Sequence, residues 1–137
     1  ERLCNKFHRL IASSAGSFIG SFVCGIRDRH DDNILIDIKK CVLFHIDYGY
    51  IFNNKVSLDT AKFAITSDLK KILELYKDGW TDFVELCVQS WMTLRQNASE
   101  LIDFARVVFA FLYQANEIEE FLRDSLKLDM SSEKAQN

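Results

Sequence analysis

The chain has 137 residues and a formal net charge of −3, and 48% of its residues are hydrophobic. This length and composition predict one domain, or part of one, with a sizeable buried core. The mild negative charge excludes non-specific nucleic-acid binding as a working hypothesis. No apolar run approaches the roughly 18 residues of a membrane span. None of the four cysteines belongs to a C-x-x-C pair, which indicates reduced thiols in a cytosolic protein rather than zinc ligands or disulfides.

The first predicted element is a long N-terminal helix. Its apolar residues recur at mostly helical spacing, and they are Leu3, Phe7, Leu10, Ile11, Phe18 and Phe22. Gly16 and Gly20 would weaken an exposed helix, so we expect both to pack closely against a neighbouring element. Because Glu1 is not a natural start residue, we expect the chain to be part of a longer one.

A charged loop and a β-hairpin follow the helix. Alternating apolar residues predict strands at 33–36 and 41–46, joined by a turn. On the second strand, His45 faces away from its two apolar neighbours, which indicates a hydrogen-bonded core residue rather than a ligand. Residues 47–65 have no clean period and are expected to form a long ordered loop, which in a compact domain is usually functional.

From residue 66 onward the chain is predicted to be helical. We expect Thr66 to cap a helix that runs to about Lys77 and ends at Asp78-Gly79, and Thr81 to cap the next helix. Later helix starts are expected at Asn97 with Glu100, at Asn116 with Glu119 and at Ser131-Ser132-Glu133. The aromatic residues assigned to the core are Phe83, Trp91, Phe104, Phe109 and Phe111.

Polar side chains with phosphoryl-transfer chemistry gather around the predicted hairpin. Asn33 begins its first strand and Asp47 ends its second, so antiparallel pairing brings both to one end, where an amide oxygen and a carboxylate suit Mg²⁺. Asp28 and His30 stand just upstream as base or charge stabiliser, beside the cation Arg29. A solvated polar loop without chemistry is the alternative, and the residues alone leave both open.

The motifs around this hairpin resemble a known family. GIRDRHDDNIL followed by LFHIDYGYIF resembles the catalytic and activation-loop segments of phosphatidylinositol 3-/4-kinases and their protein-kinase relatives, which read D-R-H-x-x-N-[IL] and H-[IV]-D-F-G. Tyr48 stands where that family usually has Phe. KFAITSDL resembles the close of the activation loop, and SLKLDMSSEKAQ resembles the stretch before the last helix. The segments HIDYGYI and LKLDMSSEKA resemble the phosphatidylinositol 3-kinases in particular, class III especially.

The resemblance implies a fold for the whole chain. Residues 1–137 would form an α+β, predominantly helical C-terminal lobe of a protein-kinase-like bilobal fold, whose small hairpin carries the catalytic and metal-binding loops. The N-terminal lobe and the last helix would lie outside this sequence. Because half an ATP site cannot hold the nucleotide or exclude water, the isolated chain is expected to bind ATP weakly and to turn over negligibly.

The resemblance also implies roles for the polar residues. Asn33 and Asp47 would ligate Mg²⁺, which Mn²⁺ can replace, and the ion would bridge the phosphates of ATP. Asp28 and His30 would orient and deprotonate the attacking inositol hydroxyl or stabilise the transferred phosphoryl group. Arg29 would serve as a structural or phosphate-side cation.

Substrate recognition is implied for two further regions. Leu35 and Ile46 align with apolar residues under the adenine ring, and the loop from Tyr48 to about Ala64 would face the lipid headgroup. Its cations are Lys55 and Lys62, and so few positive charges favour phosphatidylinositol itself over more highly phosphorylated inositides.

The implied function is ATP-dependent phosphoryl transfer to the inositol ring of phosphatidylinositol at a membrane surface, as in phosphoinositide signalling. The protein would be cytoplasmic, peripheral to membranes, and partnered by the N-terminal lobe and by regulatory domains or subunits. Three alternatives remain open from the sequence. They are a Ser/Thr protein kinase of the related group, a non-catalytic kinase-like interaction module, and a metal-dependent hydrolase that uses Asp28, Asn33 and Asp47.

Overall fold

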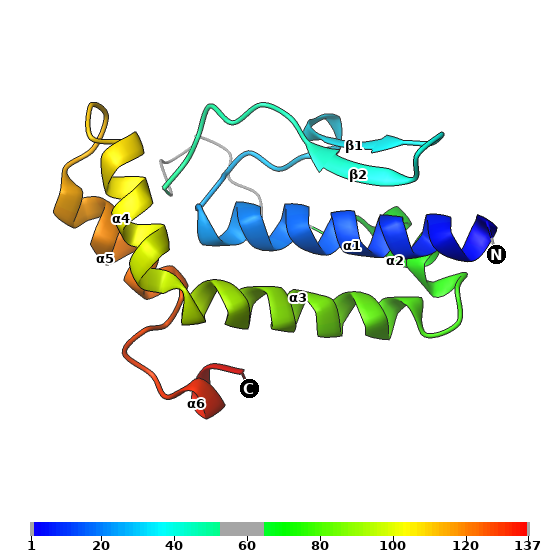
Figure 1. Cartoon of the computed structure of the whole chain (residues 1–137). Helices are drawn as coiled ribbons and strands as arrows, with labels where there is room; N and C mark the ends of the chain where they lie inside the picture. The colour runs from blue at the N-terminus through cyan, green and yellow to red at the C-terminus, as the bar shows by residue number, and fades with distance from the viewer. Residues whose placement is uncertain (1, 53–64, 137) are drawn as a thin grey trace.

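Helices dominate this computed structural model, which describes residues 2–52 and 65–136, and a two-stranded sheet lies along α1 (Figure 1). The helices are α1 (Arg2–Val23), α2 (Ser67–Glu74), α3 (Gly79–Gln96), α4 (Ala98–Val108), α5 (Ala115–Ser125) and α6 (Ser132–Gln136); the strands are β1 (Ile34–Asp37) and β2 (Val42–His45), preceded by a 3-10 turn, η1 (Asp31–Asn33). The predicted α+β, predominantly helical class is confirmed. Within the described residues, no helix combines the length and the hydrophobicity that a membrane span requires.

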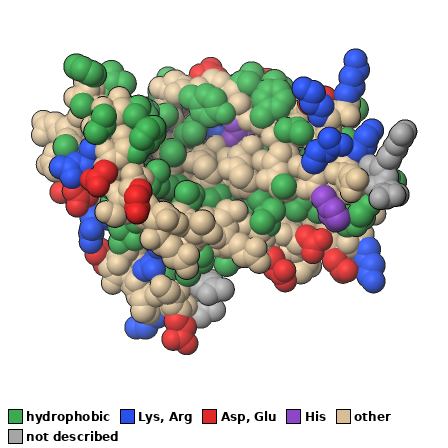
Figure 2. All heavy atoms as spheres, viewed as in Figure 1, with side chains coloured by type: hydrophobic (Ala, Val, Ile, Leu, Met, Phe, Trp, Pro, Cys, Tyr) green, Lys and Arg blue, Asp and Glu red, His purple; other side chains and the backbone are tan. Residues whose placement is uncertain are grey.

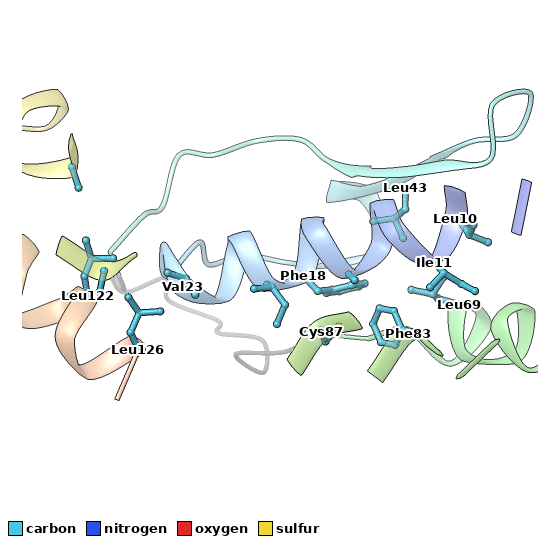
Figure 3. Close-up of a cluster of buried hydrophobic side chains, with 14 of the residues drawn as sticks. Leu10, Ile11, Phe18, Val23, Leu43, Leu69, Phe83, Cys87, Leu122 and Leu126 are labelled. Atoms are coloured by element: carbon cyan, nitrogen blue, oxygen red, sulfur yellow. The ribbon is translucent and has the colours of Figure 1, made fainter. Parts of the chain in front are cut away.

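The long predicted helix is α1, and it forms the centre of the core. It lies between the hairpin and α3 (Figure 1). Figure 3 shows Leu43 on the hairpin side of α1, with Phe83 and Cys87 on the α3 side. The rings of Phe18 and Phe83 meet edge-on with centroids 6.2 Å apart. Phe83 is 1% exposed, so its burial contributes roughly 1.5–3 kcal/mol to stability.

The predicted hairpin is confirmed to within one residue at each strand end. Its two strands are antiparallel, and the register pairs Ile34 with His45 and Asp37 with Val42. Leu43 and His45 are buried, whereas Phe44 between them is exposed. The inner face of the hairpin therefore packs on α1, as the period-two alternation predicts.

Three serines spaced four residues apart connect α1 to β2. The Leu43 amide donates to Ser13 Oγ at 2.9 Å, and Ser17 Oγ donates to the Leu43 carbonyl at 3.3 Å. One turn later, Ser21 Oγ lies 2.6 Å from His45 Nδ1. Residues four apart share a helix face, so α1 hydrogen-bonds both the backbone and a side chain of the strand above it.

The turn between α2 and α3 differs from the prediction. Thr66 caps α2 as expected, with its Oγ1 accepting from the Leu69 amide at 3.2 Å. However, α2 ends at Glu74, and α3 begins at Gly79 with Asp78 at its N-cap position, so the prediction of a start at Thr81 is wrong. An Asp-Gly pair is typical of a helix end, but here it opens the next helix.

Gly79 allows the close approach of the two helices. A Cβ atom at this position would lie 2.4 Å from the Leu73 carbonyl oxygen, which forces the backbone to shift. In α1 the situation is the opposite, because a Cβ at Gly16 or Gly20 would meet no described neighbour within 4 Å. The predicted close packing of Gly16 and Gly20 is therefore wrong.

We expect Gly79→Ala to lower the free energy of unfolding by about 1–3 kcal/mol, the usual cost of overpacking. Gly16→Ala is the matched control, because it adds the same methyl group to an exposed helix position and should stabilise the chain by roughly 0.5–1 kcal/mol. Urea denaturation of both variants measures the difference. A shift of the same sign and size in both would contradict the steric argument.

Two predicted capping boxes are wrong, although the helices exist. Asn97 precedes α4, but its Nδ2 donates backward to the Thr93 carbonyl at 2.8 Å. The box of α5 lies two residues earlier than predicted, and the Gln114 amide donates to Glu117 Oε2 at 3.0 Å. The start of α6 at Ser132 agrees with the prediction.

Some of the aromatic residues assigned to the core lie on the surface. Phe83 is buried as predicted, but Phe104 is 67% exposed and Phe111 is 99% exposed, so their assignment is wrong. Val107 and Leu112 are exposed as well, and we call these four residues, two on α4 and two in the turn that follows it, the α4 ridge. Figure 2 shows hydrophobic side chains gathered at the α4 end of the molecule. The buried face of α4 carries smaller residues, which are Ala98, Ile102 and Ala105.

Candidate active site

The predicted catalytic loop pairs with the segment that follows the hairpin. After α1 the chain runs from Cys24 to η1, and the Arg27 amide donates to the Tyr50 carbonyl at 2.9 Å. The Phe52 amide donates to the Cys24 carbonyl, also at 2.9 Å. These bonds hold the two polar loops side by side. The remainder of the predicted activation loop, including Lys55 and Lys62, lies outside the described residues.

The structure brings Asn33 and Asp47 to the same end of the hairpin. The Ile46 amide donates to the Asn33 carbonyl at 3.0 Å, which continues the strand pairing by one residue. Asp47 follows directly and is exposed. Its backbone lies in the left-handed region with φ 58°, a conformation that aspartate tolerates better than most residues.

The side-chain amide of Asn33 is oriented by the predicted catalytic loop. Asn33 is 7% exposed, and its Nδ2 donates to the Asp28 carbonyl at 2.8 Å. Its amide oxygen is therefore the atom that it can offer to a cation. No cluster of three or more His, Cys, Asp or Glu side chains suited to a metal ion occurs in the described part of the chain, so a cation here would need phosphate and water oxygens as well.

Asp28 and His30 form the polar rim of the site. His30 Nε2 lies 3.8 Å from Asp28 Oδ1 and 3.2 Å from Asn33 Nδ2. The Asp32 amide approaches His30 Nδ1 at 3.3 Å. A neutral imidazole accepts at one ring nitrogen only, so the Asp32 and Asn33 contacts are alternatives that depend on where the His30 proton lies. Asp28 also has a positive φ of 62°, in the same left-handed region as Asp47.

Arg29 is buried beneath these residues. It is 5% exposed, and its guanidinium donates to the carbonyls of Arg27 at 3.0 Å, Ile46 at 2.7 Å and Asp47. Burial lowers the pKa of Arg29 against the opposing effects of Tyr48, Asp28 and Asp47. One planar guanidinium thus connects the predicted catalytic loop to the backbone of Asp47, the residue that would bind metal.

Tyr48 contacts the same stretch of backbone as Arg29. Its hydroxyl donates to the His45 carbonyl at 2.7 Å, and the Arg29 guanidinium lies 5.8 Å from the centre of its ring. Three consecutive carbonyls, those of residues 45, 46 and 47, therefore accept hydrogen bonds from side chains. Asp47 Oδ1 in turn accepts from the Gly49 amide at 3.2 Å.

His45 is confirmed as a hydrogen-bonded core residue. It is 4% exposed, it contacts Ser21 through Nδ1, and its ring meets the ring of Phe18 edge-on at 5.2 Å. Burial, with a smaller effect of the positive Arg29, lowers the pKa of His45 to about 4, so the ring is neutral near pH 7. The sequence did not identify Ser21 as its partner, although the serine spacing of four along a helix was a usable signal.

The outer face of the hairpin carries exposed apolar side chains. Leu35, Phe44 and Ile46 are 38%, 40% and 39% exposed, and Leu35 pairs directly with Phe44. Cross-strand partners share one face of a sheet, so Phe44 belongs beside the two residues that the sequence analysis selected. Phe44 could have been identified from the sequence, because strand alternation places it on the face opposite His45.

Comparison with known proteins supports the motif assignment. The sequence matches the family profile described as phosphatidylinositol 3- and 4-kinase over residues 4–111. It is 32% identical to phosphatidylinositol 3-kinase 3 of Dictyostelium discoideum over 134 residues, which is 90% of this chain and 8% of that protein. It is 29% identical to phosphatidylinositol 4-kinase beta 1 of Arabidopsis thaliana over 100 residues, 67% of this chain and 9% of that protein. The chain therefore spans less than a tenth of the length of these relatives.

Proposed function

This chain belongs to the phosphatidylinositol 3- and 4-kinase family, and on that premise we propose that it supplies the catalytic loop, the metal site and the activation loop for ATP-dependent phosphoryl transfer to the inositol ring of phosphatidylinositol. One observation carries the proposal. The strand pairing places the Asn33 amide and the Asp47 carboxylate at one end of the hairpin, and Asn33 is held by the loop that carries Asp28 and His30.

Asn33 and Asp47 would hold Mg²⁺ or Mn²⁺ together with phosphate and water oxygens. When bound, the ion would neutralise negative charge on the phosphates of ATP. An amide oxygen and a carboxylate fit a hard divalent cation, and the backbone of both residues is held in place by hydrogen bonds. This donor set supports a magnesium site better than a zinc site.

Asp28 and His30 would act on the inositol hydroxyl. Their side chains face each other at 3.8 Å on the rim of the site, where one can orient the hydroxyl and the other can accept or stabilise charge. Arg29 would have a positioning role, because it is buried and its donors are directed at backbone carbonyls. This arrangement favours the structural option for Arg29 over direct contact with phosphate.

We further propose that the chain is the C-terminal lobe of a bilobal kinase. The exposed apolar face of Leu35, Phe44 and Ile46 supports this view, because it would form the floor of an adenine pocket that an N-terminal lobe covers. The chain by itself would then turn over negligibly. A cytoplasmic, membrane-peripheral protein with regulatory domains or subunits is consistent with a lipid substrate.

A substrate comparison tests the proposal. A polypeptide that carries these 137 residues together with an N-terminal lobe is incubated with labelled ATP and Mg²⁺, either with phosphatidylinositol vesicles or with protein substrates. We expect label in the lipid and none without Mg²⁺. Label in protein but not in lipid would replace this proposal with the protein-kinase alternative, and no label in either would favour a non-catalytic module.

A further inference from the structure

The contact between Ser21 and His45 has a feature that packing does not explain. Both residues are buried, at 7% and 4% exposure, and Ser21 Oγ lies 2.6 Å from His45 Nδ1. The other ring nitrogen, Nε2, is buried without a hydrogen-bond partner among the described residues. A buried polar ring that satisfies one of its two nitrogens is less favourable than an apolar side chain of similar size. What the Ser21 contact adds is a fixed direction for the imidazole ring.

His45 is the last residue of β2 and stands two residues before Asp47. Its ring is held by α1 through Ser21, and its carbonyl accepts from the Tyr48 hydroxyl at 2.7 Å. The chain then leaves the sheet, and Asp47 adopts a positive φ of 58°. A backbone with this φ is maintained by the contacts around it. His45 is the residue through which α1 contacts the segment that leads to Asp47.

The other two serines on this face of α1 differ in what they contact. Ser13 and Ser17 bond the backbone of Leu43, which is four residues before Asp47. Ser21 contacts a side chain, at the strand end that leads into the candidate metal site. All three serines lie on the same face of α1 and contact the same strand. Replacing them one at a time therefore separates a general role in holding the strand on the helix from a specific role at Asp47.

We infer that Ser21 and His45 are positioning residues, and that their hydrogen bond is the connection through which α1 fixes the direction of the Asp47 carboxylate. The inference rests on the proposed function, since it assigns these residues to the metal site of that reaction. Groups that orient a metal ligand typically change metal affinity or activity by about 10- to 100-fold when they are replaced.

The test uses the double variant Ser21→Ala/His45→Phe in a polypeptide that carries this chain and an N-terminal lobe. Removing both partners leaves no unpaired polar atom of this pair behind, so the unfolding midpoint should stay the same or rise. The free Mg²⁺ concentration at half-maximal rate should rise roughly tenfold or more. The matched control Ser17→Ala removes the preceding helix–strand bond and should keep the wild-type Mg²⁺ dependence. His45→Asn, which places an amide near the position of Nδ1, should recover part of the loss.

The outcomes separate the inference from the proposed function. If the double variant has wild-type Mg²⁺ dependence while Asp47→Asn is inactive, the inference is wrong and the function stands. If wild type phosphorylates no phosphatidylinositol, the function fails, and the inference is decided on the 137-residue chain by Mn²⁺ broadening of the Asp47 amide signal in nuclear magnetic resonance spectra. Weaker broadening in the double variant supports the inference; equal broadening, or none in either chain, overturns it.

Discussion

Replacing Asp47 with Asn should lower kcat for phosphatidylinositol phosphorylation at least about 10³-fold, which is ~4 kcal/mol of transition-state stabilisation. The substitution keeps the size of the side chain and suits the positive φ of this position, so the fold should persist. It removes the negative charge that would hold the metal ion, and that ion would offset charge on the transferred phosphoryl group. The rate of lipid labelling at saturating ATP and Mg²⁺ measures the effect.

The control for this experiment is Asp37→Asn at the opposite end of the same hairpin. Asp37 Oδ1 accepts from the Lys40 amide in the turn at 3.0 Å, so its role is local. This variant should keep kcat within a few-fold of wild type. If Asp47→Asn retains more than a tenth of the wild-type rate, or if both variants lose activity equally, the assignment of Asp47 as a metal ligand is incorrect.

Replacing Arg29 with Lys should destabilise the chain by about 3 kcal/mol, although the charge is kept. The guanidinium reaches three carbonyls from one buried position, and a lysine ammonium cannot span them in the same geometry. Hydrogen bonds from charged donors contribute about 1.5–3 kcal/mol each, and the partly buried carbonyls left without donors add a further cost. The urea midpoint of the 137-residue chain measures the loss.

Arg106→Lys is the matched control for Arg29. Arg106 is an exposed residue of α4 whose partners are Asp103 at 3.9 Å and Glu119 at 3.8 Å. Exposed ion pairs contribute little, so this change should stay within about 0.5 kcal/mol of wild type. Equal urea midpoints for the two variants would show that the three hydrogen bonds of the Arg29 guanidinium do not contribute to stability beyond an exposed ion pair.

The polar part of the candidate site could be predicted because it depends on local chain geometry. Once two strands are antiparallel, their register alone places Asn33 opposite Ile46 and next to Asp47. The burial of His45 follows from the same period of two. The Thr66 cap likewise depends on residues within one helical turn.

Other features depend on contacts between distant parts of the chain, and the sequence did not predict them. The start of α3 is set by how closely Gly79 approaches Leu73, which a local Asp-Gly signal does not reveal. α4 has two apolar faces, and periodicity does not tell which one meets the core. The smaller face of Ala98, Ile102 and Ala105 is buried, and the larger one is exposed.

The α4 ridge has a consequence for how the isolated chain behaves in solution. Phe104, Val107, Phe111 and Leu112 present apolar surface to water, which gives two copies a short-range attraction. The net charge of −3 supplies only weak long-range repulsion, and salt at 0.15 M screens it within about 8 Å. Colloidal stability of the chain should therefore fall as ionic strength rises, and its second virial coefficient should become less positive under the same change.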